Sequence, residues 1–425
     1  MPARGFGAPA SRCATMTCMD LLASESVGDP SPIVSLFWIA LIAVIAPLLS
    51  RLVRGYLPDV VILLVAGAMV GPHVLGWASS AGGVDLVSEL GLGMLFLLAG
   101  YELDPRLLRG RSGRTAWVVW IVCLLFAFVI VMVATNTSNS TRVAVAIALT
   151  STALGTLLPI LKQAGILDSR LGRAVMTHGA VGELGPIVAM SVLLTSRDAG
   201  SAVVVVVLFV VAAVVVGFVP VRMLDRMPDL GAGLAKLGGG TSQLPVRGVV
   251  LLLLVLMVVA EVFDLDVVLG AFAAGMILRR LIAAGHPDVD SSLEAIGYGL
   301  LIPVFFVVSG MGIDVAAVGR NPALWVWFVV TIAIARGVPV WLSERFVPRA
   351  DTLPTGRERV ELALYAATGL PIIVAVTQVA TQAGLLTADV ASILVAAGAT
   401  TVLAFPLVAR LIGATEAKPV TPAHE

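Results

Sequence analysis

Long apolar runs separated by short polar segments occupy most of the chain. Each run contains about 20 residues, the length that a helix needs to cross ~30 Å of hydrocarbon. The runs are continuous and far longer than the strands of a membrane barrel, so they predict helices. About thirteen spans are expected: 32–53, 57–73, 86–104, 115–134, 141–162, 171–196, 201–225, 246–263, 267–284, 292–312, 322–345, 358–384 and 387–412.

The composition indicates an integral membrane protein. Of the 425 residues, 59% are hydrophobic and only 13% are charged, about half of the roughly 25% that soluble domains carry. The 27 basic and 27 acidic residues leave a formal net charge of zero. These values exclude a soluble globule, a disordered chain, a disulfide scaffold and a nucleic-acid binder, and they make the lipid bilayer the expected surroundings.

The basic residues predict the orientation in the membrane. Apart from Arg336, only a few of the 27 basic residues fall on the side that holds the N-terminus: Arg4, Arg12, Arg142, Arg197 and Arg320. Positive charge marks the cytoplasm. We therefore expect a flexible extracytoplasmic tail at 1–31, a transmembrane domain at 32–413 in the plasma membrane, and a cytoplasmic tail at 414–425.

Short motifs recur in the two halves of the chain. Both Phe96–Asp104 and Phe306–Asp314 read F-x-x-x-G-x-x-[LI]-D. We interpret 32–196 and 246–413 as two six-helix repeats joined by a linker helix at 201–225. Because a single helix separates two units of six, the repeats insert with opposite topology. This architecture is typical of secondary transporters, whose substrate lies near the bilayer midplane.

Inverted repeats predict interrupted helices at equivalent places in the two halves. The pattern T-x-x-P-I occurs at 156–160 and again at 368–372. Proline removes a backbone donor, glycine loosens a helix, and hydroxyl groups can bond the freed carbonyls. The alternative to an interrupted helix is a simple packing kink, because these residues are common in transmembrane helices. The expected helix breaks involve Gly155, Pro159, Gly369, Pro371, Gly182 and Gly185, and the hydroxyl groups beside them are those of Thr150, Ser151, Thr152 and Thr368.

Glu183 lies near the middle of an otherwise uncharged stretch, 174–196. An ionised side chain in the bilayer costs at least ~2.5–3.5 kcal/mol. The empty carboxylate is therefore the costly state, and either H⁺ or a monovalent cation can neutralise it. Competition for the one site would couple the two fluxes. The alternative is a protonated Glu183 that hydrogen-bonds a neighbouring helix.

Other polar residues in or near the spans have supporting interpretations. Arg336 cannot release its proton, so it either balances the negative ends of the broken helices or pairs with an acid. His178 does not share the helix face of Glu183; a structural role is favoured over a proton relay. Glu102 lies near a span end, where a side chain easily reaches water.

Several motifs, taken in order, resemble the monovalent cation:proton antiporter superfamily in its Kef-like branch. They are Ala66–Pro72, Gly93–Asp104, Leu149–Ala153, Leu269–Gly275 and Pro303–Met311. The resemblance covers about 32–412. It implies thirteen helices in two inverted repeats with crossed broken helices. It also implies a moving core of spans 4–6 and 11–13, and a scaffold of spans 1–3 and 8–10 through which two subunits dimerise.

The resemblance also implies roles for single residues. Glu183 falls at the family's essential ion-binding acid and Arg336 at its basic position in the eleventh span. Thr150, Ser151, Thr152 and Thr368 match the unwound segments. The family usually places Asp, Asn or Gln before the acid, but this chain has Gly182. We therefore expect electroneutral exchange of one cation per proton.

The predicted function is exchange of Na⁺ or K⁺ for H⁺ by alternating access, with the transported cation as the only metal at Glu183. A K⁺ efflux channel or uniporter of the same fold and a non-transporting regulatory membrane protein remain alternatives. An enzyme is least expected, and no cofactor is expected, because no H-x-x-x-H, G-x-S-x-G or H-E-x-x-H motif occurs.

Overall fold

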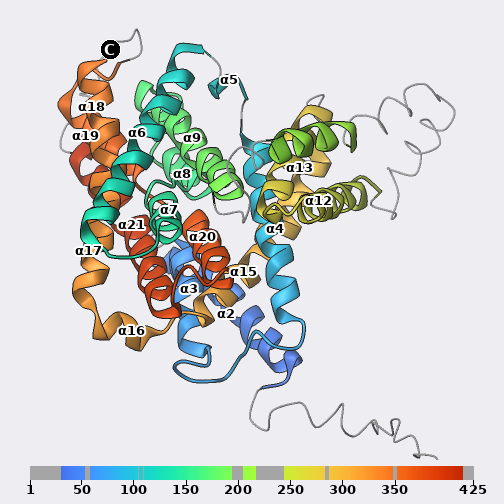
Figure 1. Cartoon of the computed structure of the whole chain (residues 1–425). Helices are drawn as coiled ribbons and strands as arrows, with labels where there is room; N and C mark the ends of the chain where they lie inside the picture. The colour runs from blue at the N-terminus through green and yellow to red at the C-terminus, as the bar shows by residue number, and fades with distance from the viewer. Residues whose placement is uncertain are drawn as a thin grey trace, which may run out of the picture.

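The computed structural model describes residues 30–52, 58–103, 105–108, 110–193, 204–216, 244–282, 287–347 and 352–414. Throughout these ranges the regular structure is helical, without a strand (Figure 1). The predicted tails, except for their innermost residues, lie outside the described ranges, as do Asp104 and the end of the predicted linker helix. The all-helical class is thus confirmed.

Apolar helices fill the regions that the hydropathy pattern predicts. The first half contains α2 (Pro32–Leu52), α3 (Asp59–Val70), α4 (Val84–Glu102), α5 (Pro105–Leu108), α6 (Gly110–Ala134), α7 (Asn139–Leu149), α8 (Leu154–Gln163) and α9 (Arg170–Leu193). A short apolar helix, Val204–Val216, lies in the predicted linker range. Within the described ranges, nine helical segments are long and apolar enough to span a membrane. Thirteen remains a prediction.

The second half has more interruptions. It contains α12 (Leu244–Val262), α13 (Val267–Ile282), α14 (Pro287–Ile296), η1 (Gly297–Leu301), α15 (Ile302–Met311), α16 (Val315–Arg320), α17 (Pro322–Ile332), η2 (Ala333–Gly337), α18 (Val338–Phe346), α19 (Gly356–Ala366), α20 (Pro371–Gln382) and α21 (Ala388–Ala414). The segments η1 and η2 are single π-helical turns, which add a residue to a turn and occur often at functional sites.

The helices pack as two bundles (Figure 1). The α4 bundle contains α2, α3, α4, α12, α13 and α15, and the α9 bundle contains α6 to α9 and α17 to α21. Glycine allows the closest approaches in the α4 bundle. A Cβ on Gly67 would meet the backbone of Val307, and a Cβ on Gly100 would meet that of Phe272. These contacts fix α3 against α15 and α4 against α13.

Two helices of the α9 bundle are interrupted in its centre. The helix of α7 ends at Leu149 and α8 begins at Leu154, while α19 ends at Ala366 and α20 begins at Pro371. The two interruptions touch, because the N–H of Ala153 donates to the carbonyl of Thr368 at 2.7 Å. This bond pairs a backbone N–H of one interruption with a carbonyl of the other, groups for which helical bonding supplies no partner.

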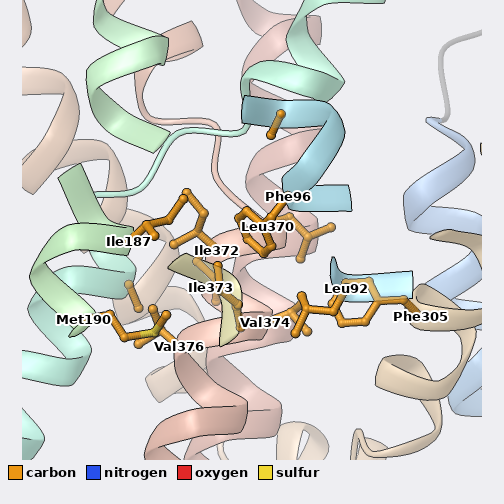
Figure 2. Close-up of a cluster of buried hydrophobic side chains, with 14 of the residues drawn as sticks. Leu92, Phe96, Ile187, Met190, Phe305, Leu370, Ile372, Ile373, Val374 and Val376 are labelled. Atoms are coloured by element: carbon orange, nitrogen blue, oxygen red, sulfur yellow. The ribbon is translucent and has the colours of Figure 1, made fainter. Parts of the chain in front are cut away.

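Buried apolar side chains join the two bundles (Figure 2). Leu92 and Phe96 of α4 and Phe305 of α15 gather with two residues of the α9 bundle, Leu370 and Val374. We call these five residues the apolar seal. Every one of them is at most 6% exposed, so water is excluded from the contact between the bundles.

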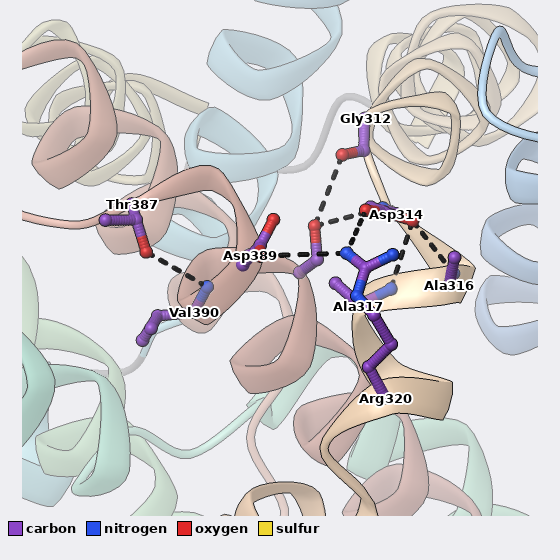
Figure 3. Close-up of polar contacts among 9 residues, drawn as sticks. Gly312, Asp314, Ala316, Ala317, Arg320, Thr387, Asp389 and Val390 are labelled. Atoms are coloured by element: carbon purple, nitrogen blue, oxygen red, sulfur yellow. Dashed lines mark hydrogen bonds and ion pairs between the residues drawn. The ribbon is translucent and has the colours of Figure 1, made fainter.

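A polar contact joins the bundles at the end of α15 (Figure 3). The Asp314 carboxylate accepts from the N–H groups of Ala316 at 2.8 Å and Ala317 at 3.1 Å, which caps α16. The Asp314 N–H donates to Ser392 of α21 at 3.0 Å. Arg320 lies 3.1 Å from Asp314 and 3.7 Å from Asp389. The connection from the α4 bundle is therefore attached to the first turns of α21.

Candidate ion-binding site

A cavity of about 370 Å³ lies between the two bundles and contains Glu183. The α4 bundle contributes Glu102 and the adjoining η1 contributes Tyr298 to its wall. Both interrupted helices reach the cavity through Gly155 and Thr156 of α8 and Pro371 of α20. The acid singled out by the sequence thus shares one cavity with the ends of both broken helices.

The Glu183 side chain is 4% exposed, and its Oε2 atom has no hydrogen-bond partner among the described residues. A buried polar atom without a partner is costly, and a buried carboxylate without a counter-charge is far more so. The site therefore favours an occupant that neutralises the carboxylate: a proton on the carboxyl group or a cation in the cavity beside it.

Three of the predicted ligand hydroxyls bond to their own helices. The hydroxyls of Thr150, Ser151 and Thr368 donate to carbonyls three or four residues earlier, at 2.9 to 3.1 Å. They satisfy carbonyls that the ends of α7 and α19 leave free. None of them lines the cavity of Glu183, so the structure does not bring them together with the carboxylate.

Thr152 links the first interruption to the rest of the site. Its hydroxyl donates to the Ala366 carbonyl at 2.6 Å, at the end of α19. Its backbone N–H donates to the Gly182 carbonyl at 2.9 Å, in the turn that carries Glu183. Through this residue the two interruptions and α9 are held in one arrangement.

Arg336 is completely buried and lies in η2. Its Nη2 donates to the His178 carbonyl at 2.8 Å, and Nε and Nη2 both reach the Thr152 hydroxyl at 3.3 Å. Among the described residues, no carboxylate forms an ion pair with it. The guanidinium thus lies against a carbonyl and a hydroxyl beside the interruption, a place where it can balance the negative end of α19.

The prediction that Gly182 and Gly185 break a helix is wrong. Helix α9 runs without interruption from Arg170 to Leu193. A Cβ on Gly182 would meet Thr152 Oγ1, and a Cβ on Gly185 would lie 2.6 Å from the Trp120 ring. The two glycines are therefore needed for close packing of α9 and not for a kink.

In the first half of the chain, the helix interruption lies slightly earlier than the predicted glycine and proline positions. Gly155 and Pro159 lie inside α8, after the non-helical residues 150–153. Gly369 lies in the second interruption, and Pro371 is the first residue of α20. Proline suits a first helical position, because the N–H that it lacks would have no helical partner there.

The structure adds four polar side chains to the site that the sequence did not indicate, those of Asp59, Glu102, Thr156 and Tyr298. The sequence assigned Glu102 to the edge of the membrane, but its side chain lines the cavity of Glu183. The Tyr298 hydroxyl donates a hydrogen bond to the Glu102 carboxylate. Thr156 lines the same cavity. No motif marks Tyr298, because a single tyrosine in an apolar helix is unremarkable without its neighbour.

A second cavity, of about 270 Å³, lies on the other side of the apolar seal. Its polar lining is uncharged and includes Ser88, Ser309 and Thr377. Along α4, Ser88 lines this second cavity, the seal residues follow, and Glu102 lines the first. The apolar seal therefore separates two cavities, and Glu183 lines the first one.

Comparison with known proteins identifies relatives for most of the chain. A family model described as "Sodium/hydrogen exchanger, transmembrane" matches residues 40–412. YjbQ of Bacillus subtilis, a protein assigned to the Na⁺/H⁺ antiporters, is 21% identical over 345 residues, 76% of this chain. The glutathione-regulated potassium-efflux system protein KefC of Cronobacter sakazakii is 27% identical over 393 residues, 89% of this chain. The chain spans 55% of YjbQ and 60% of KefC.

The fold matches a solved structure. The sodium proton antiporter MjNhaP1 of Methanocaldococcus jannaschii superimposes with a TM-score of 0.62 at 18% sequence identity. The match covers 90% of this chain and 96% of that protein. The helical arrangement described above is therefore one that a membrane antiporter also uses.

Proposed function

Because the chain belongs to the sodium/hydrogen exchanger family of membrane transporters, we propose that it exchanges a monovalent cation, Na⁺ or K⁺, for H⁺. The observation that carries this proposal is the buried Glu183, which lies in a cavity between two bundles and whose Oε2 has no partner in the described part of the chain. The family is one of transporters, so the chain is not an enzyme.

Glu183 couples the two fluxes in this proposal by accepting either a proton or a cation, never both. An ionised, empty Glu183 is too costly to move through a dry contact between bundles. The carboxylate therefore changes sides only when neutralised. One negative charge needs one positive charge, so the exchange is electroneutral, with one cation per proton.

Alternating access accounts for the two cavities. The apolar seal of Leu92, Phe96, Phe305, Leu370 and Val374 lies between them. The distribution of basic residues assigns the Glu183 cavity to the cytoplasmic side, so this conformation is open inward. Displacement of the α9 bundle along the α4 bundle would carry Glu183 past the seal to the other side.

We also propose the setting in which the transporter works. It lies in the plasma membrane with its N-terminus outside and its C-terminus in the cytoplasm. It forms a homodimer through spans 1–3 and 8–10. Broad apolar faces on α2 and α12, whose span windows are only 22% and 28% buried, support this contact.

Proton flux in proteoliposomes tests the proposal. Purified protein should move protons when a Na⁺ or K⁺ gradient is imposed, and clamping the membrane potential should leave the rate unchanged. Glu183→Gln keeps the size of the side chain but cannot exchange a proton, so flux should fall to the background of empty liposomes. Glu89→Gln, on the exposed part of α4, is the control and should retain the flux.

Two results would contradict the proposal. Cation current without proton movement would identify a channel or uniporter. Unchanged cation-driven proton flux in Glu183→Gln would exclude Glu183 as the exchanging group.

A further inference from the structure

The cavity of Glu183 is lined by two further carboxylates, those of Asp59 at the start of α3 and of Glu102 on the last turn of α4. Arg279 of α13 fixes this turn, because its Nη1 donates to the carbonyls of Tyr101 at 2.9 Å and Glu102 at 2.8 Å. The guanidinium takes the place of helical donors that are missing at a helix end. The backbone from which Glu102 enters the cavity is therefore held firmly.

Tyr298 fixes the other end of the Glu102 side chain. Its hydroxyl donates to the carboxylate from η1, the π-helical turn at Gly297–Leu301. An extra residue in a turn rotates the side chains that follow it, which lets Tyr298 face α4. The carboxylate of Glu102 is thus directed into the cavity and not left to extend freely into solvent.

The charges around the cavity favour a cation there. Glu102 and Glu183 repel each other electrostatically across the cavity. A cation between the two acids relieves this repulsion, and the unpartnered Oε2 of Glu183 offers it a ligand. Glu294 adds negative charge near Glu102, while Lys162 and Arg279 offset part of it.

We propose that Glu102, held by Tyr298, is a second cation-binding carboxylate that captures the transported cation at the cavity mouth before it reaches Glu183. This inference rests on the proposed exchange and deepens it. Glu102 is half-buried whereas Glu183 is 4% exposed, so an entering cation meets Glu102 before Glu183.

The position of Glu102 makes its action one-sided. It belongs to the α4 bundle, whereas Glu183 belongs to the α9 bundle. When the α9 bundle moves, Glu183 leaves the cavity and Glu102 remains. Glu102 therefore strengthens cation binding on this side of the membrane and contributes nothing on the other.

Transport in vesicles of both orientations tests this asymmetry. The cation concentration for half-maximal exchange is measured in everted vesicles, where the cytoplasmic face is outside, and in right-side-out vesicles. Glu102→Gln should raise it about tenfold on the cytoplasmic face, the effect of losing a contact worth ~1.4 kcal/mol. The half-maximal cation concentration on the outer face should change by a clearly smaller factor.

Two further variants make the test specific. Tyr298→Phe removes only the hydroxyl that holds Glu102, so it should reproduce the one-sided change with a smaller size. It also serves if Glu102→Gln does not fold. Glu89→Gln removes a carboxylate from the same helix outside the cavity and should change neither face.

The outcomes separate this inference from the proposed function. If wild-type vesicles show no cation-driven proton flux, the exchange itself is wrong and Glu102 captures nothing. If the wild type exchanges but Glu102→Gln and Tyr298→Phe match Glu89→Gln on both faces, the capture site alone is refuted. An equal shift on both faces also overturns it, because Glu102 would then move with the site.

Discussion

Arg336 illustrates at the scale of one residue how a buried charge is accommodated when none of the described carboxylates pairs with it. Its guanidinium donates to the His178 carbonyl and the Thr152 hydroxyl, and it is fully buried. A planar fork can reach both groups at once, whereas an ammonium is a compact point charge. The residue therefore holds η2, the first interruption and α9 in register.

Two replacements of Arg336 should distinguish the contribution of its charge to stability from that of its planar guanidinium. Arg336→Lys keeps the charge but loses the fork, and Arg336→Met removes the donors that reach the His178 carbonyl and the Thr152 hydroxyl. We expect Arg336→Met to lower the free energy of unfolding by ~1.5–3 kcal/mol, the usual worth of hydrogen bonds made by a charged group, and Arg336→Lys to lower it by less. Thermal unfolding in detergent measures both, and Arg114→Lys at an exposed position of α6 is the control. Equal stability of wild type and Arg336→Met would contradict the role given to these contacts.

Gly182 gives a second prediction at this scale. In Gly182→Ala the added Cβ would meet Thr152 Oγ1, beside the Arg336 guanidinium. Overpacking of this kind costs ~1–3 kcal/mol, and exchange should fall because Glu183 is the next residue. Gly248→Ala in α12, where a Cβ meets open space, is the control and should keep or slightly raise stability. A Gly182→Ala protein as stable and active as the wild type would show that α9 packs less closely than described.

The interrupted helices show what a local pattern predicts at the scale of elements. Hydroxyl, glycine and proline residues predicted interruptions near 150–159 and 366–371, and the structure has them at 150–153 and 367–370. The pattern could not predict that Thr150, Ser151 and Thr368 bond to their own helices. A hydroxyl can serve a helix end or an ion equally well, and only its neighbours in space determine which.

Helix α16 provides a pH-dependent prediction. The N–H of Ala317 above all, then that of Ala316 and the Arg320 guanidinium, hold the pKa of Asp314 below its ordinary value. This capping is therefore complete above the ordinary aspartate pKa and is lost as the pH falls through the lowered native value. Amide hydrogen exchange at Ala316 and Ala317, corrected for intrinsic rates, should accelerate in that acidic range.

The control for this prediction is Asp314→Asn. Asparagine can still cap a helix but does not titrate, so its exchange rates should lack the acid-dependent step. A step of the same size in Asp314→Asn would assign the titration to another group.

At the scale of the whole molecule, the seal between the bundles keeps the two cavities apart. Val374→Thr keeps the volume of the side chain and adds a hydroxyl, which lets water approach the dry contact. We expect proton leak without a cation gradient to rise severalfold while the protein still folds. Pyranine-loaded proteoliposomes measure the leak.

The matched control is Val118→Thr on α6, whose side chain is 60% exposed. It adds the same hydroxyl away from the seal and should leave the membrane as tight as the wild type. Equal leak from the two variants would mean that the seal is not the barrier.

The sequence alone determined that this is a helical membrane protein with an acid, Glu183, in the middle of an apolar span. Apolar runs of membrane length and a charge in the middle of one are properties of the chain, because the bilayer penalises each charge wherever the helices pack. Only the tertiary structure placed Glu102 and Tyr298 opposite Glu183 and set Gly182 against Thr152. Those relations join residues far apart in the chain, and they depend on how two bundles meet, which no local pattern encodes.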